Sequence, residues 1–193
     1  TRTATVTRKT KETDIEISIE VDGTGTTTIE TGVGFFDHLL TALGHHSLID
    51  LDIRCDGDLD IDDHHTVEDT SIALGQAIGQ ALGDRAGIQR FGEATVPMDE
   101  AIATCTVDVG GRPYPVIDVA LRQSMIGNLS TQNVPHALEA FARSAGFTLH
   151  LTASGTNDHH IAEASFKALA RAIRSAVAPD ARRVGVASTK GTT

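Results

Sequence analysis

Hydrophobic and polar residues alternate along the segment TDIEISIEVDG, residues 13–23. Ile15, Ile17, Ile19 and Val21 fall on one face and acidic or hydroxyl side chains on the other, which predicts a half-buried strand. The turn DGTG follows it, and we expect the next segment, TTTIET, to be its hairpin partner.

Helical spacing replaces the alternation in FFDHLLTALGHHS, where we expect a helix that stops at Gly44. LIDLDIRCD alternates again and predicts a strand. The apolar positions from His64 to Leu82 fit a second helix, closed by Gly83. The first half of the chain therefore has the predicted order strand, strand, helix, strand, helix.

The same order returns in the second half of the chain. DEAIATCTVDVGGRPYPVIDVAL supplies two strands around GGRP, VPHALEAFARSAG a helix, FTLHLTA a strand, and DHHIAEASFKALARAIRSAV a long helix that ends at Pro179. We predict one α+β domain over residues 1–193, made by internal duplication of this half. Its pseudo-repeats span about 1–86 and 87–178, and residues 179–193 form a C-terminal tail over the site.

One polar motif, Asp-His-His-x-x-Glu, occurs once in each half, within LDIDDHHTVEDTS and GTNDHHIAEASF. On the first turns of a helix, His64 and Glu68 are at i and i+4 and share a face, whereas His65 lies about 100° further round. The two histidines of each motif are therefore expected to bind different metal ions. His38 and His136 lie on the shorter helix of each half, where the repeat predicts further histidines.

Together these positions give six imidazoles and two carboxylates, which divide into two mixed nitrogen and oxygen sites. Such sites suit Mn²⁺, Fe²⁺, Zn²⁺ or Co²⁺, and a six-coordinate site with open positions for substrate favours manganese. The alternative is that the histidines are helix-terminal hydrogen-bonding groups, but two motifs in register with matching glutamates favour metal ligation. The predicted ligands are His38, His64, His65, Glu68, His136, His159, His160 and Glu163.

Cationic side chains are few, so their positions are informative. Arginine forks, a lysine and a hydroxyl are the groups that bind a phosphate monoester, although each alone is a common surface group. Glu12, ahead of the first strand, is a candidate general base or a solvated carboxylate. The candidate phosphate contacts are Arg90, Arg112, Lys167, Ser188 and Lys190.

Bulk composition limits the classes of protein. Hydrophobic content of 40% and charged content of 22% are typical of an ordered globular chain, and no apolar run reaches the roughly 18 residues of a membrane helix. Cys55 and Cys105 show no Cys-x-x-Cys spacing, so we expect a soluble cytoplasmic protein. The net charge of −10, without a basic stripe, disfavours nucleic acid as a partner. It also suits a high-salt cytosol, a hypothesis that loss of folding in low-salt buffer would support.

Several segments occur in the order found in one enzyme family, and they cover essentially the whole chain. The chain resembles imidazoleglycerol-phosphate dehydratases of histidine biosynthesis, and the paired DHHTVEDT and DHHIAEASFKA motifs are the most specific part of this likeness. The segments are RKTKETDI, GFFDHLLTALG, DDHHTVEDTSIALG, RFG, PMDE, GGRP, NDHHIAEASFKA and STKG.

The resemblance implies roles for the residues at matching positions. The eight predicted ligands would hold two Mn²⁺ ions per active site, and Glu12 would be the catalytic carboxylate. Arg90, Arg112, Ser188 and Lys190 would contact phosphate or substrate. The family also implies a homo-oligomer of 24 chains with sites between subunits, and four helices sandwiched between two sheets. The implied reaction converts imidazoleglycerol phosphate to imidazole acetol phosphate and water, with Glu12 removing the C2 hydrogen.

Other functions fit part of the pattern. A dinuclear metallohydrolase would need two metals about 3.5–4 Å apart, usually with bridging carboxylates, and two glutamates among eight ligands are few for this. A metal-storage shell would leave the phosphate-type cations and Glu12 unexplained. A nucleic-acid-binding module is disfavoured by the acidity of the chain.

Overall fold

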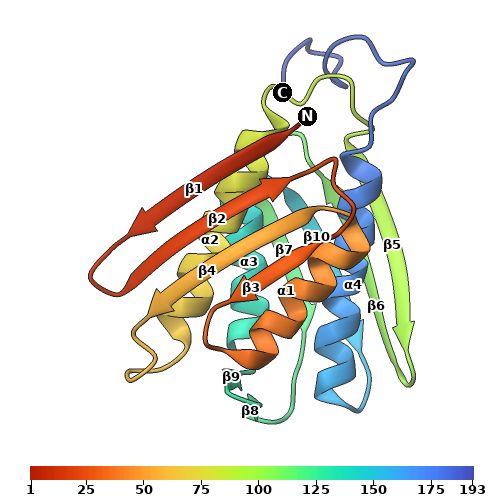
Figure 1. Ribbon diagram of the computed structural model, residues 1–193. Helices are drawn as coiled ribbons and strands as arrows, with labels where there is room; N and C mark the ends of the chain where they lie inside the picture. Colours follow the sequence, from red (N-terminus) through yellow and green to blue (C-terminus); the bar gives the residue numbers. More distant parts are fainter.

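Two four-stranded sheets enclose a layer of four helices in the computed structural model, which describes residues 1–193 (Figure 1). The first sheet has the order β1-β2-β4-β3 and the second the order β5-β6-β10-β7. The first sheet is formed by β1 (Thr3–Lys9), β2 (Thr13–Glu20), β3 (Thr27–Glu30) and β4 (Asp50–Gly57). The second is formed by β5 (Phe91–Met98), β6 (Ala101–Asp108), β7 (Tyr114–Val119) and β10 (Thr148–Ser154). A small hairpin joins β8 (Met125–Ile126) to β9 (Leu129–Ser130).

The four helices pair across the two halves. The helices are α1 (Gly34–Ser47), α2 (His64–Leu82), α3 (Asn133–Ala145) and α4 (Asp158–Ala176). Helix α1 packs against α4, and α2 against α3, while α2 covers β1 and β2 and α4 covers β5 and β6. Because the fully buried Ile17, Leu74, Leu149 and Ile173 belong to one hydrophobic cluster, the two halves share a single core. No helix combines the length and the apolar character needed to cross a membrane.

The predicted α+β class and internal duplication are confirmed, but each half has more strands than predicted. The first half has the order strand, strand, strand, helix, strand, helix, because β1 was missed. The second half repeats this order with β5, which was also missed, and adds the short strands β8 and β9 before α3. The predicted hairpin between 13–23 and TTTIET is wrong. Strand β2 pairs antiparallel with β1 and β4, whereas β3 pairs parallel with β4. Strands β6 and β7 flank GGRP as predicted, with β10 between them.

Helix α1 does not stop at Gly44 but continues to Ser47. A Cβ atom at Gly44 would lie 2.4 Å from Cγ2 of Thr27 and 3.1 Å from Cδ1 of Leu51. The glycine is therefore a close-packing position against β3 and β4, not a helix terminus. The helix ends instead at Leu48, which adopts the left-handed conformation with φ of 61°.

All four helices begin at one end of the molecule, the lower end in Figure 1. The segment containing β8 and β9 crosses this end and is held by the two aspartates that precede the histidine pairs. Asp63 accepts a hydrogen bond from the Ser130 N–H at 2.7 Å, and Asp158 accepts one from the Gln123 N–H at 2.8 Å. The candidate metal ligands, which occupy the first two turns of the helices, are thus brought to the same end.

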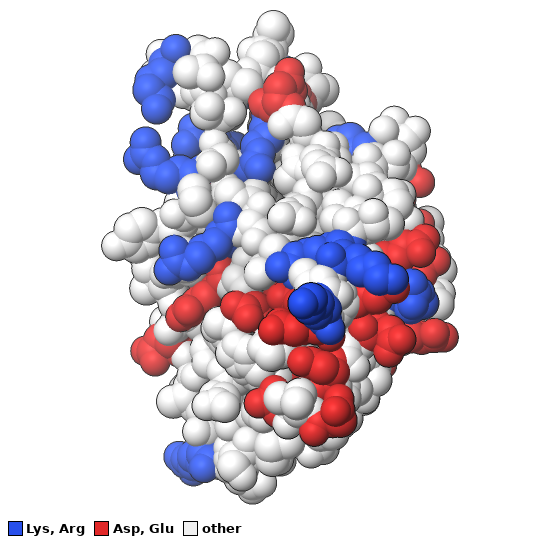
Figure 2. All heavy atoms as spheres, turned by 90° about the vertical axis from the view of Figure 1, so that its left-hand side faces the viewer, with Lys and Arg blue, Asp and Glu red and all other residues white.

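The face of the molecule in Figure 2 carries a band of acidic side chains across its middle, with basic side chains directly beside it. Outward positions of β2 and β4 are charged as their alternation predicts: Glu16 lies opposite Arg54, and Glu20 opposite Asp50. Inward positions of the same strands are apolar, so this sheet has one packed face and one hydrated face.

Candidate metal centre and anion cleft

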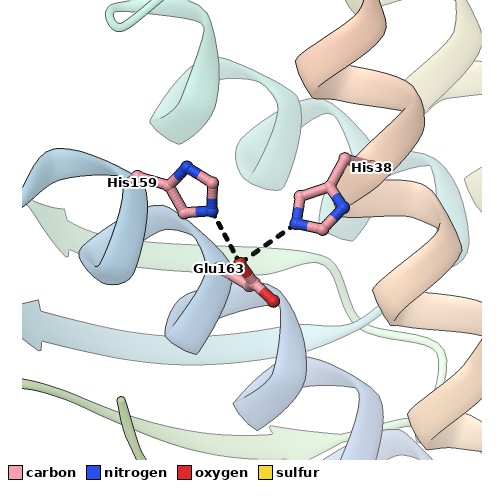
Figure 3. A group of neighbouring side chains, drawn as sticks. All are labelled: His38, His159 and Glu163. Carbon is pink, nitrogen blue, oxygen red and sulfur yellow. Dashed lines mark hydrogen bonds and ion pairs between the residues drawn. The ribbon is translucent and has the colours of Figure 1, made fainter. Parts of the chain in front are cut away.

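One cluster of candidate ligands lies between the first turns of α1 and α4. Oε2 of Glu163 is 3.0 Å from Nε2 of His38 and 2.9 Å from Nε2 of His159, so one buried carboxylate oxygen lies between two half-exposed rings (Figure 3). The other carboxylate oxygen is 3.0 Å from Nζ of Lys167. His159 and Glu163 meet because they are one helical turn apart on α4.

Burial alone would raise the pKa of Glu163. Hydrogen bonds from His38, Lys167 and His159, with the positive charge of Lys167, outweigh that burial and hold the pKa at about 2. The carboxylate therefore remains ionised and is ready to act as a ligand.

A second cluster lies between α2 and α3. Nε2 of His64 is 3.4 Å, and Nε2 of His136 3.3 Å, from carboxylate oxygens of Glu68. The two rings stack with their centroids 5.0 Å apart. The two nitrogens are close to the carboxylate, yet Nε2 of His136 is buried and has no hydrogen-bond partner.

Both clusters fit a divalent transition metal ion. In each, two imidazole nitrogens and one carboxylate oxygen lie within 4.8 Å of one another. Three such ligands leave coordination positions open, and a metal ion would supply the partner that the buried Nε2 of His136 lacks. Helix N-termini disfavour cations, and the carboxylates of Glu68 and Glu163 offset that effect.

The remaining two predicted ligands, His65 and His160, do not join either cluster of their own chain. Nδ1 of His65 is 2.7 Å from Asp58, and Nδ1 of His160 is 2.8 Å from Glu100. These hydrogen bonds are the largest cause of the raised pKa of each histidine. Within each motif the two rings are nearly perpendicular, at 85° and 80°, as expected if neighbouring histidines serve different ions.

Glu12 lies in the turn between β1 and β2, beside the first histidine pair. Its Oε2 is 3.5 Å from Nε2 of His65, and its side chain is half-exposed. The hairpin that carries Glu12 is anchored to α2 by a residue that the sequence did not single out. Buried Asp69 accepts a hydrogen bond from Oγ1 of Thr13 at 2.7 Å and pairs with Arg8 at 2.8 Å.

Four of the five predicted phosphate contacts line one cleft of about 1020 Å³ beneath the C-terminal tail. These four are Arg90, Arg112, Ser188 and Lys190. Residues of the C-terminal tail, among them Arg183, form part of the lining of this cleft. Lys167, the fifth candidate, lies elsewhere, beside Glu163.

The guanidinium of Arg90 is already bonded within the chain. It donates to both carboxylate oxygens of Asp108, at 2.8 and 3.1 Å, and to the carbonyl of Ala187 at 2.5 Å. The hydrogen bond from Arg90 to Asp108 is the main cause of its raised pKa. Arg112 and Lys190 form no ion pair, so their charge is available to an anion.

The cleft and the two clusters lie at opposite ends of the helix layer. The Arg90 N–H donates to the carbonyl of Ala176, the last residue of α4, whereas His159 is in the first turn of that helix. A helix of 19 residues is about 28 Å long. One small molecule cannot reach both regions of the same chain.

Known proteins resemble this chain over nearly its full length. A family model described as imidazoleglycerol-phosphate dehydratase matches residues 31–173. The enzyme of that name from Acidiphilium cryptum is 55% identical over 192 residues, with 98% of each chain covered. That from Haloarcula marismortui is 52% identical over 190 residues, covering 98% of this chain and 97% of the relative. A crystal structure of imidazoleglycerol-phosphate dehydratase from Staphylococcus aureus has a TM-score of 0.84 at 35% identity, covering 92% of this chain and 99% of that one.

Proposed function

The chain belongs to the imidazoleglycerol-phosphate dehydratase family, hydro-lyases of histidine biosynthesis, and we propose that it removes water from its substrate with two Mn²⁺ ions per active site. The observation that carries the metal dependence is the pair of equivalent clusters, each with two imidazoles and one glutamate. The donor set, which lacks thiolates, favours manganese over softer metals.

We assign the metal ligands to two sets. His38, His159 and Glu163 hold one ion, and His64, Glu68 and His136 hold the other. His65 and His160 belong to neither cluster, and we propose that each completes a metal site of a neighbouring chain. A bound ion would supply Lewis acidity to the imidazole ring of the substrate and so favour loss of the adjacent hydroxyl.

Glu12 is the proposed general base of the reaction. The C2 hydrogen of the substrate leaves as a proton to the Glu12 carboxylate, and the C3 hydroxyl departs, so that one molecule of water is lost overall. The resulting enol takes up a proton at C3 and releases the proton of its C2 hydroxyl, which gives the ketone of imidazole acetol phosphate. The position of Glu12 supports this role, because its carboxylate is half-exposed and 3.5 Å from Nε2 of His65, itself a proposed ligand.

Arg112, Ser188 and Lys190 are proposed to bind the phosphate, with Arg90 shaping the cleft and offering part of its charge. Their task is to fix the position of the substrate, since phosphate is not broken or transferred. We propose that Lys167 instead balances the charge of Glu163, with which it forms an ion pair.

The active site is proposed to lie between chains of a homo-oligomer, with 24 subunits as the family implies. The separation of the cleft from the clusters supports this assembly, since a substrate held by the cleft of one chain must meet the ligands of another. We further propose a cytoplasmic location, supported by the free, buried thiols of Cys55 and Cys105.

The proposed function is tested by turnover of imidazoleglycerol phosphate after the protein has been stripped with a chelator, with and without added Mn²⁺. Formation of the ketone only after Mn²⁺ is returned supports the dehydratase with its metal sites. Full activity in the stripped protein, verified to be free of metal, contradicts it. A hydrolase is disfavoured because Glu68 and Glu163 belong to separate clusters and no carboxylate is shared between them.

A further inference from the structure

Each half of the chain has a glutamate immediately before the second strand of its first hairpin. Glu12 precedes β2, which begins at Thr13, and Glu100 precedes β6, which begins at Ala101. Since β1 and β5 occupy equivalent edges of their sheets, the two glutamates are counterparts in the duplicated fold.

The two glutamates differ in what faces them across the sheet. Thr13 pairs with Gly57 in the first sheet, and Ile102 pairs with Ser154 in the second. Extending each ladder by one or two positions places Asp58 opposite Glu12 and Thr156 opposite Glu100. The first half thus has a carboxylate at a position where the second half has only a hydroxyl.

In the second half, Glu100 uses both of its carboxylate oxygens. Oε2 accepts a hydrogen bond from Nδ1 of His160 at 2.8 Å. Oε1 accepts hydrogen bonds from the backbone N–H groups of Thr156 at 3.1 Å and Asn157 at 2.7 Å, just before α4. Glu100 therefore joins the hairpin, the start of the helix and the ring of His160.

In the first half, the imidazole ring of His65 is bound by Asp58 and not by the hairpin glutamate. Its Oδ2 is 2.7 Å from Nδ1 of His65. Glu12 accordingly forms no close hydrogen bond through its carboxylate, and its nearest partner is Nε2 of His65 at 3.5 Å. Because Asp58 binds Nδ1 of His65, the carboxylate of Glu12 is left without a close hydrogen bond.

We propose that Glu100 is a positioning residue that fixes the proton of His160 on Nδ1 and presents Nε2 as a metal ligand, the part that Asp58 plays for His65. An ionised carboxylate only accepts hydrogen bonds, so in the neutral imidazole the nitrogen that faces it carries the single proton and the other nitrogen keeps its lone pair. This inference rests on the proposed function, in which His160 ligates an ion. It explains why only one of two equivalent glutamates is free to act as a base.

Replacement of Glu100 by glutamine should leave only one of its two sets of contacts intact. Both carboxylate oxygens of Glu100 accept hydrogen bonds, one from the backbone N–H groups and the other from His160. A glutamine amide has only one acceptor oxygen, and its NH₂ group is a donor, so it cannot accept hydrogen bonds from both. A donor facing Nδ1 would move the ring proton to Nε2 and block ligation. Glu93→Gln is the matched control, because Glu93 is an exposed glutamate of the adjoining strand β5.

The test titrates the full chain, stripped of metal with a chelator, with Mn²⁺ and measures free Mn²⁺ by electron paramagnetic resonance. We expect two ions per unmodified chain, and in Glu100→Gln one of the two sites weakened by about 10–100-fold. Glu93→Gln should bind like the unmodified chain. In a His160→Ala background, Glu100→Gln should cause no additional loss, because the carboxylate acts through that ring.

The inference is overturned if Glu100→Gln binds Mn²⁺ with unchanged affinity. It is also overturned if Glu100→Gln weakens Mn²⁺ binding equally in the His160→Ala background, because Glu100 would then act only in folding of the turn. If the unmodified chain binds no Mn²⁺, the proposed function fails together with this inference. If Glu100→Gln does not assemble, Asp58→Asn applies the same test to His65. An undiminished affinity there overturns the proposal.

Discussion

Glu163 of α4 and His38 of α1 form a 3.0 Å hydrogen bond across 125 positions of the chain. The same carboxylate oxygen is 2.9 Å from His159 on its own helix. Two rings from different halves of the duplicated fold are thus held by one oxygen before any ion binds. Glu163 therefore organises its cluster, in addition to its proposed role as a metal ligand.

Glu163→Gln should weaken Mn²⁺ binding by more than about 100-fold, because it removes a negatively charged oxygen ligand and leaves two imidazoles without an anionic acceptor. Turnover should fall with the loss of the ion. Calorimetric titration with Mn²⁺ measures the change, and Glu16→Gln, on the exposed face of β2, is the control for charge. Equal Mn²⁺ affinity in the two variants would exclude Glu163 as a ligand.

The depressed pKa of Glu163 predicts an acid-dependent stability of the metal-free protein. Its carboxyl has a pKa of about 2 in the fold, against an ordinary value of 4.5. The folded state thus binds the proton less readily than the unfolded state, so the stabilisation is complete above pH 4.5 and is lost as the pH falls toward 2. The shift corresponds to about 3 kcal/mol.

Urea denaturation of the metal-free protein at pH 5, 4 and 3 measures this effect. The free energy of unfolding should fall more steeply with acidity in the unmodified chain than in Glu163→Gln, whose amide does not titrate in this range. Parallel pH dependence of the two proteins would show that Glu163 has the same proton affinity in both states.

Glu12→Gln should retain Mn²⁺ and substrate binding while turnover falls by about 10²–10⁴-fold, the usual contribution of a general base. The substitution preserves the shape of the side chain and the backbone bond between Glu12 and Asp58. Steady-state production of the ketone gives the rate, and equilibrium binding of substrate gives the affinity. Turnover equal to that of the unmodified enzyme would remove Glu12 from the chemistry.

The long helices and the inner strands were predictable because their apolar periodicity is strong. The α2 helix begins at His64 and closes at Gly83 as expected. The edge strand β1 was missed because it is rich in threonine and buries only Val6 fully. The pairing of β3 was wrong because a sequence turn indicates that the chain reverses, but not which strand it then joins.

The histidines and glutamates of the motif were found from their spacing, but their environment was not. Spacing on one helix places His64 beside Glu68, and the duplication suggested His38 and His136. That His65 would face a local aspartate could not be read from the sequence, since Asp58 belongs to a loop without periodicity. Contacts of this kind depend on how loops pack at the ends of the helices.

Arg112→Ala and Arg90→Ala should differ in their effects, although both residues line the cleft. Arg112 has no ion pair, so its loss should raise KM about 10- to 100-fold with little change in melting temperature. Arg90 holds Asp108 and the carbonyl of Ala187, so its loss should also lower the melting temperature. Steady-state kinetics and thermal unfolding together separate the two. Equal thermal destabilisation would contradict the assignment of Arg90 to the structure of the cleft.

Removal of metal should loosen the assembly, because His65 and His160 are proposed to reach the metal sites of neighbouring chains. Ligands that belong to different chains couple ion binding to association, so the ions stabilise the oligomer by mass action. Native mass spectrometry before and after complete chelation measures the change, and return of Mn²⁺ should restore the original mass. The double variant His65→Ala/His160→Ala should dissociate without chelation, whereas His45→Ala/His46→Ala, at the far end of α1, should not. An assembly of unchanged mass after verified metal removal would show that protein contacts alone hold the chains together.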